Sequence, residues 1–279
     1  MRELKGKPVA DAITGEMKER IAALQEKGRV PTLAIVRVGE RPDDLSYEKG
    51  AVKRFAGAGA VTRVCALPAD CSQEALEDTI RTLNHDPAVH GILLFRPLPK
   101  HLSEERVKQL LAPEKDMDCL TDAGYASLLT GGKLCPPCTP RAVVELIDHY
   151  GIDLTGKKVT VVGRSLVVGK PLALLLLAKN ATVTVCHTRT KDLPAECRAA
   201  DVLVACAGSA KMIGPDHVCP GQIVIDVGIN VDKDGNLCGD VDFAAVADTV
   251  DAITPVPRGV GSITTAVLLK HVVEAAERV

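Results

Sequence analysis

The feature that most constrains the fold is a repeated alternation of apolar, strand-like runs with helical segments. Seven short runs rich in β-branched residues are candidate strands: 32–39, 62–68, 91–97, 158–163, 182–187, 202–208 and 221–229. The segments between them with helical patterning are 43–57, 72–85, 103–111, 140–150, 168–179 and 241–247. The strand runs are continuously apolar rather than alternating, which is typical of strands buried on both faces of a parallel sheet. This βαβ rhythm predicts a doubly wound α/β architecture.

A break between two domains is predicted near residues 140–156. In "CTPRAVVELIDHYGIDLTGKK", Thr139 can cap a helix, Pro140 suits its first turn, and Gly151 ends it. A second set of strands begins after this helix. The stretch 262–279 predicts a final helix with an apolar stripe that could return to the first domain. The expected domains are residues 1–139 with 262–279, and residues 140–261.

Composition excludes several classes of function. Of 279 residues, 46% are hydrophobic and 25% charged, enough for a large core, and the net charge of −2 provides no basic field for nucleic acid. Aromatic residues for stacking nucleic-acid bases are also scarce. The longest apolar run, 171–178, is too short to span a membrane, and the first residues lack the apolar core of a signal peptide. We therefore expect a cytoplasmic protein with no membrane or nucleic-acid partner.

The ten cysteines include one C-x-x-C pair, Cys135 and Cys138. Such a pair is compatible with zinc or redox chemistry, but zinc normally requires two further ligands at similar spacing, and none is visible. Most of the cysteines lie in apolar runs, where a reduced thiol behaves as a small hydrophobic group. The sequence favours structural thiols and predicts no metal site.

The stretch "KKVTVVGRSLVVGKPLALLLL" places a strand, a glycine turn and a helix in succession. Gly163 ends the strand and Gly169 lies in the first turn of the helix, with Ser165 where a dinucleotide motif usually has its middle glycine. A helix N-terminus still favours a phosphate at this point. The pattern indicates a dinucleotide site, with an ordinary tight βα turn as the alternative.

The end of the next strand indicates which dinucleotide is bound. An NAD site usually has an acidic residue there to hold the ribose hydroxyls, but this chain has Thr188 and Arg189, with Arg164 in the glycine turn. Two guanidinium groups would suit a 2′-phosphate. NADP is therefore favoured, NAD remains possible, and the arginines could equally be solvated surface charges.

An ordered set of motifs then resembles a known family, the methylenetetrahydrofolate dehydrogenase/cyclohydrolases. The motifs are "PTLAIVRVG" (31–39), "GILLFRPLP" (91–99), "KDMD" (115–118), "PCTP" (137–140), "GRSLVVGKP" (163–171), "TVTVCHTRT" (182–190), "DVGIN" (226–230), "GDVDF" (239–243) and "ITPVPRGVG" (253–261). They cover nearly the whole chain. The resemblance implies two α/β domains, the second Rossmann-like, with a cleft between them, and a homodimer.

The resemblance also implies roles for individual residues. Tyr47 and Asp118 would be catalytic residues that contact the pterin end of a tetrahydrofolate substrate. Further substrate contacts would come from Pro257, Gly259, Val260 and Gly261, in a loop that closes the cleft. The cofactor contacts would be Gly163, Arg164, Ser165, Thr188 and Ile229. Read from the residues alone, a carboxylate such as Asp118 could accept paired donors from an aminopterin ring, while a turn aspartate is an equally good interpretation, especially for Asp116.

The chain departs from the family at two positions. Bifunctional members carry Tyr-x-x-x-Lys, which places both side chains on one helical face, but the residue four positions after Tyr47 is Ala51. The family's strand "GILVQLPLP" has a glutamine that supports the lysine, and Phe95 stands in that position here. The two changes are either independent and neutral, or together they mark the loss of one chemical step.

The chemistry indicates which step would be lost. Transfer of hydride from 5,10-methylenetetrahydrofolate requires close positioning of substrate and cofactor, whereas hydrolysis of the methenyl product requires activated water and proton transfer. The resemblance, together with these two departures, implies an NAD(P)-dependent dehydrogenase with weak or absent cyclohydrolase activity. One alternative is a bifunctional enzyme in which Lys53 or a water chain carries the proton. A second is a non-catalytic regulator that binds folate or nucleotide.

Overall fold

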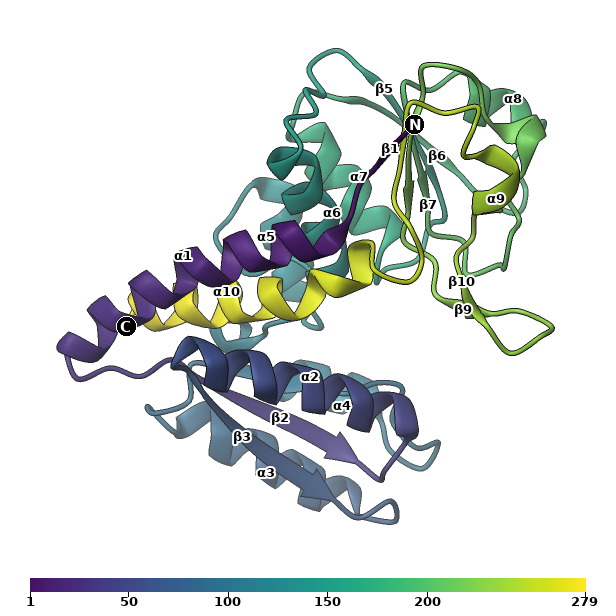
Figure 1. Ribbon diagram of the computed structural model, residues 1–279. Helices are drawn as coiled ribbons and strands as arrows, with labels where there is room; N and C mark the ends of the chain where they lie inside the picture. Colours follow the sequence, from purple (N-terminus) through teal and green to yellow (C-terminus); the bar gives the residue numbers. More distant parts are fainter. The chain divides into compact units, whose positions relative to one another are not determined.

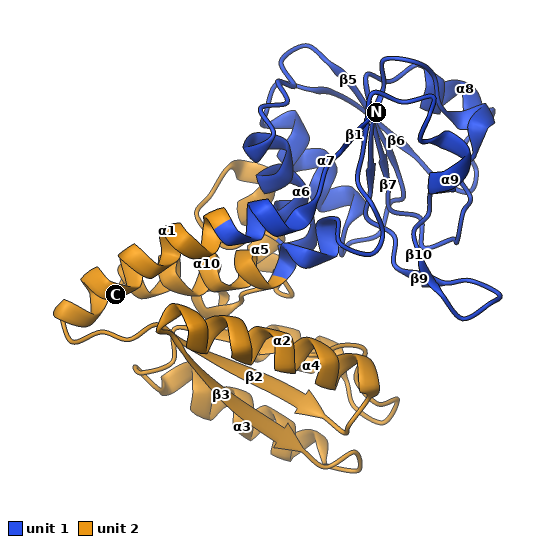
Figure 2. Ribbon diagram, viewed as in Figure 1, with its two compact units in different colours: residues 1–11, 137–264 blue, residues 12–136, 265–279 orange.

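The computed structural model describes residues 1–279, which form two compact units (Figure 2). Unit 1 comprises Met1–Asp11 with Pro137–Thr264, and unit 2 comprises Ala12–Pro136 with Thr265–Val279. Each unit is therefore assembled from two separate parts of the chain. One unit boundary falls inside the first helix, a second lies between Pro136 and Pro137, and the third is at the start of the last helix. The first and last helices are labelled α1 and α10 in Figure 1.

Unit 2 contains a three-stranded parallel sheet in the order β3–β2–β4. The strands are β2 (Thr32–Val38), β3 (Val61–Leu67) and β4 (Gly91–Leu94). Its helices are most of α1 (Gly6–Glu26), α2 (Pro42–Ala58), α3 (Gln73–His85), α4 (Glu104–Leu110), the short η1 (Pro113–Lys115), α5 (Asp122–Thr130) and nearly all of α10 (Thr264–Glu277).

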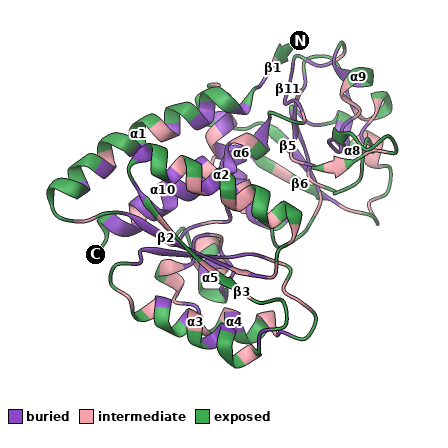
Figure 3. Cartoon of the chain, turned by 60° about the horizontal axis from the view of Figure 1, so that its bottom comes forward, coloured by how far each residue is buried: buried purple, intermediate pink, exposed green.

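The core of unit 2 gathers on the central strand and on α10, where buried residues predominate (Figure 3). Two contacts attach α10 to other segments of the unit. The Arg29 guanidinium donates to the Ala276 carbonyl over 2.8 Å, and the buried His271 ring lies 3.1 Å from the Met117 carbonyl. The final helix predicted from the apolar stripe is thus an integral part of this unit.

Unit 1 contains a six-stranded sheet in the order β1–β11–β8–β7–β5–β6, and every neighbouring pair is parallel. The strands are β1 (Arg2–Glu3), β5 (Lys158–Val162), β6 (Thr182–Cys186), β7 (Val202–Ala205), β8 (Ile223–Asp226) and β11 (Ala252–Ile253), with a separate hairpin of β9 (Asn230–Val231) and β10 (Leu237–Cys238). Its helices are α6 (Cys138–His149), α7 (Gly169–Leu177), α8 (Leu193–Arg198), η2 (Pro215–His217), α9 (Phe243–Val246) and η3 (Val260–Ser262).

The predicted fold class, two α/β domains with parallel sheets, is confirmed. Two details differ from the sequence-based expectation. Strands β3 and β6 lie at sheet edges and expose many of their residues, so they are not buried on both faces. Residues 1–11 lie in unit 1 rather than with the first domain, because β1 pairs with β11. None of the helices combines the length and apolar character needed to span a bilayer.

Candidate functional site

Helix α2 places Tyr47 beside Phe95, which follows β4. The helix buries one face, formed by Ala51, Phe55 and Ala58. Tyr47 lies one turn before Ala51 and is half-buried, and its ring meets the Phe95 ring edge-on, with 5.9 Å between centroids and 82° between planes. Ala51 is fully buried and Phe95 nearly so. The two positions that depart from the family pattern, Ala51 and Phe95, therefore provide apolar surface near Tyr47.

The basic residues of α2 are Lys49, Lys53 and Arg54, and their environments differ. Lys49 and Lys53 are exposed to solvent. The Arg54 guanidinium donates to Thr265 Oγ1 over 2.9 Å and to Thr14 Oγ1 over 2.7 Å. These contacts fix Arg54 between α1, α2 and α10, and a guanidinium is a poor proton carrier at neutral pH.

The structure assigns different contacts to Asp116 and Asp118, for which the sequence left open a ligand-binding carboxylate and a turn aspartate. Asp116 is buried and accepts from the Thr121 N–H over 2.7 Å and from the Asp118 N–H over 3.4 Å, so it stabilises the local turn. Asp118 is half-buried, and its Oδ2 lies 3.8 Å from Nη2 of Arg96. Asp118 is the better placed of the two to meet a ligand.

Two residues near Asp118 were missed by the sequence analysis. Arg96 lies between Asp118 and Glu104, whose Oε1 accepts from it over 3.3 Å. Burial, reinforced by negative charge nearby, raises the pKa of the Tyr125 hydroxyl to about 12. Tyr125 is therefore a neutral hydrogen-bond donor at physiological pH. Only its aromatic character in a chain poor in aromatics could have drawn attention to it.

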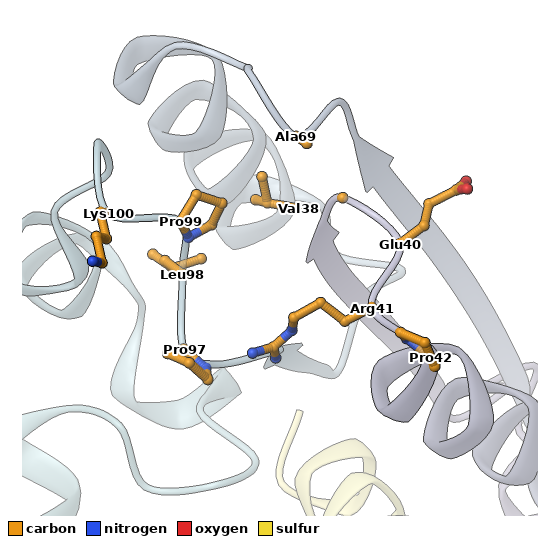
Figure 4. Close-up of a pocket in the computed structure, with 10 residues that line it drawn as sticks. Val38, Glu40, Arg41, Pro42, Ala69, Pro97, Leu98, Pro99 and Lys100 are labelled. Carbon is orange, nitrogen blue, oxygen red and sulfur yellow. The ribbon is translucent and has the colours of Figure 1, made fainter.

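A pocket of about 710 Å³ opens at the carboxyl ends of β2, β3 and β4 (Figure 4). It is lined by Val38–Pro42, Ala69 and Pro97–Lys100. Glu40 points away from the other lining side chains, while the Arg41 guanidinium turns toward Pro97. Arg41 donates to the Arg96 carbonyl over 2.7 Å, which connects the pocket wall to the partner of Asp118.

In unit 1 the glycine turn after β5 requires its two glycines. Gly163 has φ +135°, and a Cβ there would lie 2.3 Å from the Cys206 carbonyl oxygen. A Cβ on Gly169 would lie 2.1 Å from the Gly163 carbonyl oxygen. Ser165 Oγ accepts from the Val168 N–H over 3.1 Å at the entry to α7. Only hydrogen side chains permit this compact turn, which presents the exposed Arg164 and Ser165 at its surface.

The neighbouring strand brings Thr188 to the same edge of the sheet. Strands β5 and β6 are paired in parallel, and the Gly163 N–H donates to the Cys186 carbonyl over 2.9 Å. Thr188 and Arg189 lie two and three positions after Cys186 and are exposed. Since β6 and β7 flank β5 on opposite sides, the chain reverses direction across the sheet here, and such switch points bind ligands at their carboxyl ends.

The last group of predicted residues lines a second pocket of about 190 Å³. Its walls are Asp226–Ile229, Leu237 and Pro255–Ser262. Ile229 is 67% exposed, and a Cβ on Gly261 would lie 3.3 Å from its Cδ1. Arg258, at φ +80°, has a left-handed backbone conformation in this loop. The structure thus brings Ile229 together with Pro257, Gly259, Val260 and Gly261 within unit 1.

The cysteine pair is structural in character. Cys135 and Cys138 are buried and form no disulfide, and burial raises the pKa of Cys135 to about 12. A neutral thiol of this kind is neither a good nucleophile nor a metal ligand. No group of three or more His, Cys, Asp or Glu side chains is arranged to hold a metal ion.

Comparison with known families accounts for both units. Residues 4–118 match the model of the tetrahydrofolate dehydrogenase/cyclohydrolase catalytic domain, and residues 137–279 match that of the NAD(P)-binding domain of the same family. The chain belongs to the tetrahydrofolate dehydrogenase/cyclohydrolase family.

Individual relatives resemble the chain over nearly its whole length. The bifunctional protein FolD of Clostridioides difficile is 55% identical over 275 residues, which cover 98% of this chain and 96% of the relative. A Campylobacter jejuni structure of the bifunctional enzyme FolD has a TM-score of 0.96 at 39% identity, covering 100% of this chain and 99% of that one. A Trypanosoma brucei FolD structure, complexed with NADP cofactor and inhibitor, has a TM-score of 0.91 at 37% identity, covering 98% and 96%.

The residues of unit 1 fit the dinucleotide that the family binds. The compact turn leaves a surface at the N-terminus of α7 that a Cβ at Gly163 or Gly169 would disrupt. The positive end of the α7 dipole favours an anionic group such as a phosphate at this turn. Arg164 and Thr188 lie at the same edge of the sheet, so this member of the tetrahydrofolate dehydrogenase/cyclohydrolase family has the components of an NAD(P) site.

Proposed function

We propose that the chain oxidises 5,10-methylenetetrahydrofolate to 5,10-methenyltetrahydrofolate with NADP⁺ as the acceptor. The observation that carries the proposal is the glycine turn at the carboxyl edge of the unit 1 sheet, where only glycine fits at two positions. Membership of the family, whose catalytic domain matches residues 4–118, supports the folate substrate. The Trypanosoma brucei structure with NADP supports the cofactor.

The proposed substrate contacts come from two places in the chain. Tyr47 offers a half-buried aromatic face, and Asp118 a carboxylate that can accept paired hydrogen bonds from the pterin. The loop from Pro257 through Gly259 and Val260 to Gly261 supplies further contacts to the substrate. Binding and orientation of the substrate are the main contributions a protein makes to hydride transfer.

The proposed cofactor contacts are Gly163, Arg164, Ser165, Thr188 and Ile229. When bound, NADP⁺ supplies the hydride acceptor. Arg164 and Arg189 are exposed cations at the sheet edge where the ribose would lie, and no carboxylate stands at the end of β6 to hold a free 2′-hydroxyl. This charge pattern supports NADP over NAD.

Some observations favour cyclohydrolase activity, the second activity of the family, and others favour its loss. Relatives as similar as the Clostridioides difficile protein are named bifunctional, which favours an enzyme that also hydrolyses the methenyl product to 10-formyltetrahydrofolate. The buried Ala51 and Phe95 favour slow hydrolysis, because neither side chain can accept or donate a proton beside Tyr47. Our proposal is a dehydrogenase with weak cyclohydrolase activity, and the bifunctional enzyme is the alternative that the comparisons favour.

Initial rates with NADP⁺ and with NAD⁺ at equal concentration, in the presence of 5,10-methylenetetrahydrofolate, test the dehydrogenase assignment. We expect substrate-dependent reduction of the cofactor, faster with NADP⁺. Faster reduction of NAD⁺ would contradict the assignment of cofactor. An absence of reduction with both cofactors would contradict the enzymatic function and favour a binding protein.

A homodimer is also part of the proposal. Val231 and Leu237 face each other across the β9–β10 hairpin and are 64% and 53% exposed, which provides apolar surface for a second copy. Sedimentation equilibrium should give twice the mass of one chain, and a monomer at micromolar concentration would contradict this expectation.

A further inference from the structure

Two buried carboxylates lie next to the proposed cofactor residues and have no role in the function described so far. Asp226 is the last residue of β8, and Asp240 follows β10. Asp240 is fully buried and Asp226 is 3% exposed. Burying a carboxylate is costly unless it is paired or hydrogen-bonded, so the contacts of these two residues explain why they are tolerated.

Asp240 holds the loop after β7 through three consecutive amides. Its Oδ2 accepts from the Ala207 N–H over 2.6 Å and from the Gly208 N–H over 3.1 Å. Its Oδ1 accepts from the Ser209 N–H over 2.8 Å and from the Asn230 side-chain amide over 2.9 Å. Residues 207–209 are themselves exposed, so a buried anchor fixes an exposed loop.

Asp226 in turn holds the backbone that carries Asp240. Its Oδ1 accepts from the N–H of Gly228 over 2.9 Å and of Asp240 over 3.0 Å, and its Oδ2 accepts from the Val241 N–H over 2.9 Å. The space around the pair is filled, because a Cβ on Gly239 would lie 1.8 Å from Asp226 Oδ2. The two acids form one rigid connection between the ends of β7 and β8.

Both segments that Asp240 holds adjoin proposed cofactor residues. Cys206, the residue before the anchored loop, is in contact distance of Gly163, where an added Cβ would overlap its carbonyl. Asn230 directly follows Ile229. We propose that Asp240 is a positioning residue for the dinucleotide, fixing the loop 207–209 and the segment 229–230 on either side of the site. This inference rests on the proposed NADP-dependent function.

Four hydrogen-bond donors meet the side chain of Asp240, and only a carboxylate can accept from all of them. Two carboxylate oxygens can accept all four hydrogen bonds, because each has two lone pairs. In Asp240→Asn one oxygen becomes an NH₂ group that faces N–H donors and can accept none of them. We therefore expect this near-isosteric change to release part of the loop while leaving the volume of the core unchanged.

The experiment measures NADP⁺ binding by titration calorimetry and backbone hydrogen exchange on the full chain, without turnover. For Asp240→Asn we expect exchange at residues 207–209 to become at least about tenfold faster and the Kd for NADP⁺ to rise by about tenfold or more, the loss typical of breaking a charged hydrogen bond. For Asn230→Ala, a half-buried site that should fold even if Asp240→Asn does not, we expect faster exchange at 229–230 and a Kd about threefold higher.

Gln222→Ala is the matched control. Gln222 is buried at the other end of β8, and its amide donates to the Cys197 and Ala200 carbonyls over 2.7 and 2.9 Å. Its loss should destabilise unit 1 without changing NADP⁺ affinity. An unchanged Kd for NADP⁺ in both Asp240→Asn and Asn230→Ala would overturn this inference and leave the proposed function intact. An equal loss of NADP⁺ affinity in Gln222→Ala would have the same consequence. A wild-type protein that does not bind NADP⁺ would overturn the proposed cofactor as well.

Discussion

At the scale of single residues, Ala51, Phe95 and Asp118 show what a sequence can reveal about a site. The helical spacing from Tyr47 identifies Ala51 as the position on the same helical face, and the structure places it on the buried face of α2. The contact between Tyr47 and Phe95 joins residues 48 positions apart and is not encoded in any local pattern. The same is true of Arg96 and Tyr125 near Asp118, because only the folded chain brings them together.

The double substitution Ala51→Lys with Phe95→Gln tests whether the apolar pair limits hydrolysis. We expect methenyl hydrolysis to rise by about 10²-fold or more, the contribution typical of a positioned acid or base, with the dehydrogenase rate reduced less than tenfold. The measurement is methenyl absorbance with and without enzyme, and Phe95→Gln alone is the control. Because Ala51 is fully buried, denaturant unfolding should accompany the assay. A folded double variant with unchanged hydrolysis would refute the explanation.

Asp118→Asn should weaken folate recognition selectively. The neutral amide loses the charge that accepts paired donors, so we expect the KM for 5,10-methylenetetrahydrofolate to rise by about tenfold or more. The Kd for NADP⁺ should stay within about twofold of wild type, because Asp118 is not among the proposed cofactor contacts. Asp122→Asn, at an exposed acid paired with Lys108, is the control. An unchanged KM in Asp118→Asn would remove Asp118 from the site.

Asp226 should make stability depend on pH. Burial raises its pKa to about 6 from 3.8, and the nearby Asp240 adds to the shift, while backbone hydrogen bonds oppose it. The folded state therefore holds this proton more tightly than the unfolded chain, so the contribution of Asp226 to stability is present below pH 3.8 and is lost as pH rises through about 6.

Urea unfolding of wild type and Asp226→Asn between pH 4 and 7 isolates this effect. The difference in unfolding free energy between the two proteins should change by up to about 1.4 kcal/mol per pH unit within the window. The unfolding free energy of wild type should fall relative to that of Asp226→Asn as pH rises. Curves that run parallel across the window would show that Asp226 does not titrate there.

At the scale of elements, the sequence predicts best where the pattern is long and locally complete. All seven predicted strands exist, because continuous apolar runs bounded by turn residues have few other outcomes. Helix α1 is not among the predicted helices, although Val9, Ile13, Met17 and Ile21 form a buried stripe at four-residue intervals. Strands β1 and β11 have two residues each and could not be predicted, because only their pairing across the chain defines them.

The turn between β5 and α7 gives a prediction at this scale. In Gly169→Ala the new Cβ would overlap the Gly163 backbone, so α7 must move away from the turn. We expect the unfolding free energy to fall by about 1–3 kcal/mol and the Kd for NADP⁺ to rise by about tenfold or more. Calorimetric titration and urea unfolding measure the two effects.

Gly214→Ala is the control for this prediction, because nothing lies within 4 Å of a Cβ there and its φ of −114° suits any residue. Its unfolding free energy should stay within about 0.5 kcal/mol of wild type. Normal NADP⁺ affinity in Gly169→Ala would show that the geometry of this turn is not needed for binding.

At the scale of the whole molecule, each unit closes with a segment from a distant part of the chain. The C-terminal helix α10 completes unit 2, and residues 1–11 complete unit 1. The sequence predicted the first of these, because α10 carries an apolar stripe that needs a partner. The sequence does not predict that residues 1–11 join unit 1, because the two residues of β1 carry no pattern that indicates pairing with β11. Family membership, by contrast, follows from motifs spread along the whole chain, and the comparisons confirm it.

The partition of product between the two family activities tests the proposed weak cyclohydrolase activity most directly. Purified wild-type protein is supplied with 5,10-methylenetetrahydrofolate and NADP⁺, and methenyl and 10-formyl products are quantified over time against an enzyme-free control started from methenyltetrahydrofolate. We expect rapid NADPH formation, with methenyltetrahydrofolate accumulating and disappearing at close to the spontaneous rate. Conversion to 10-formyltetrahydrofolate that keeps pace with NADPH formation would contradict the proposed function and establish a bifunctional enzyme.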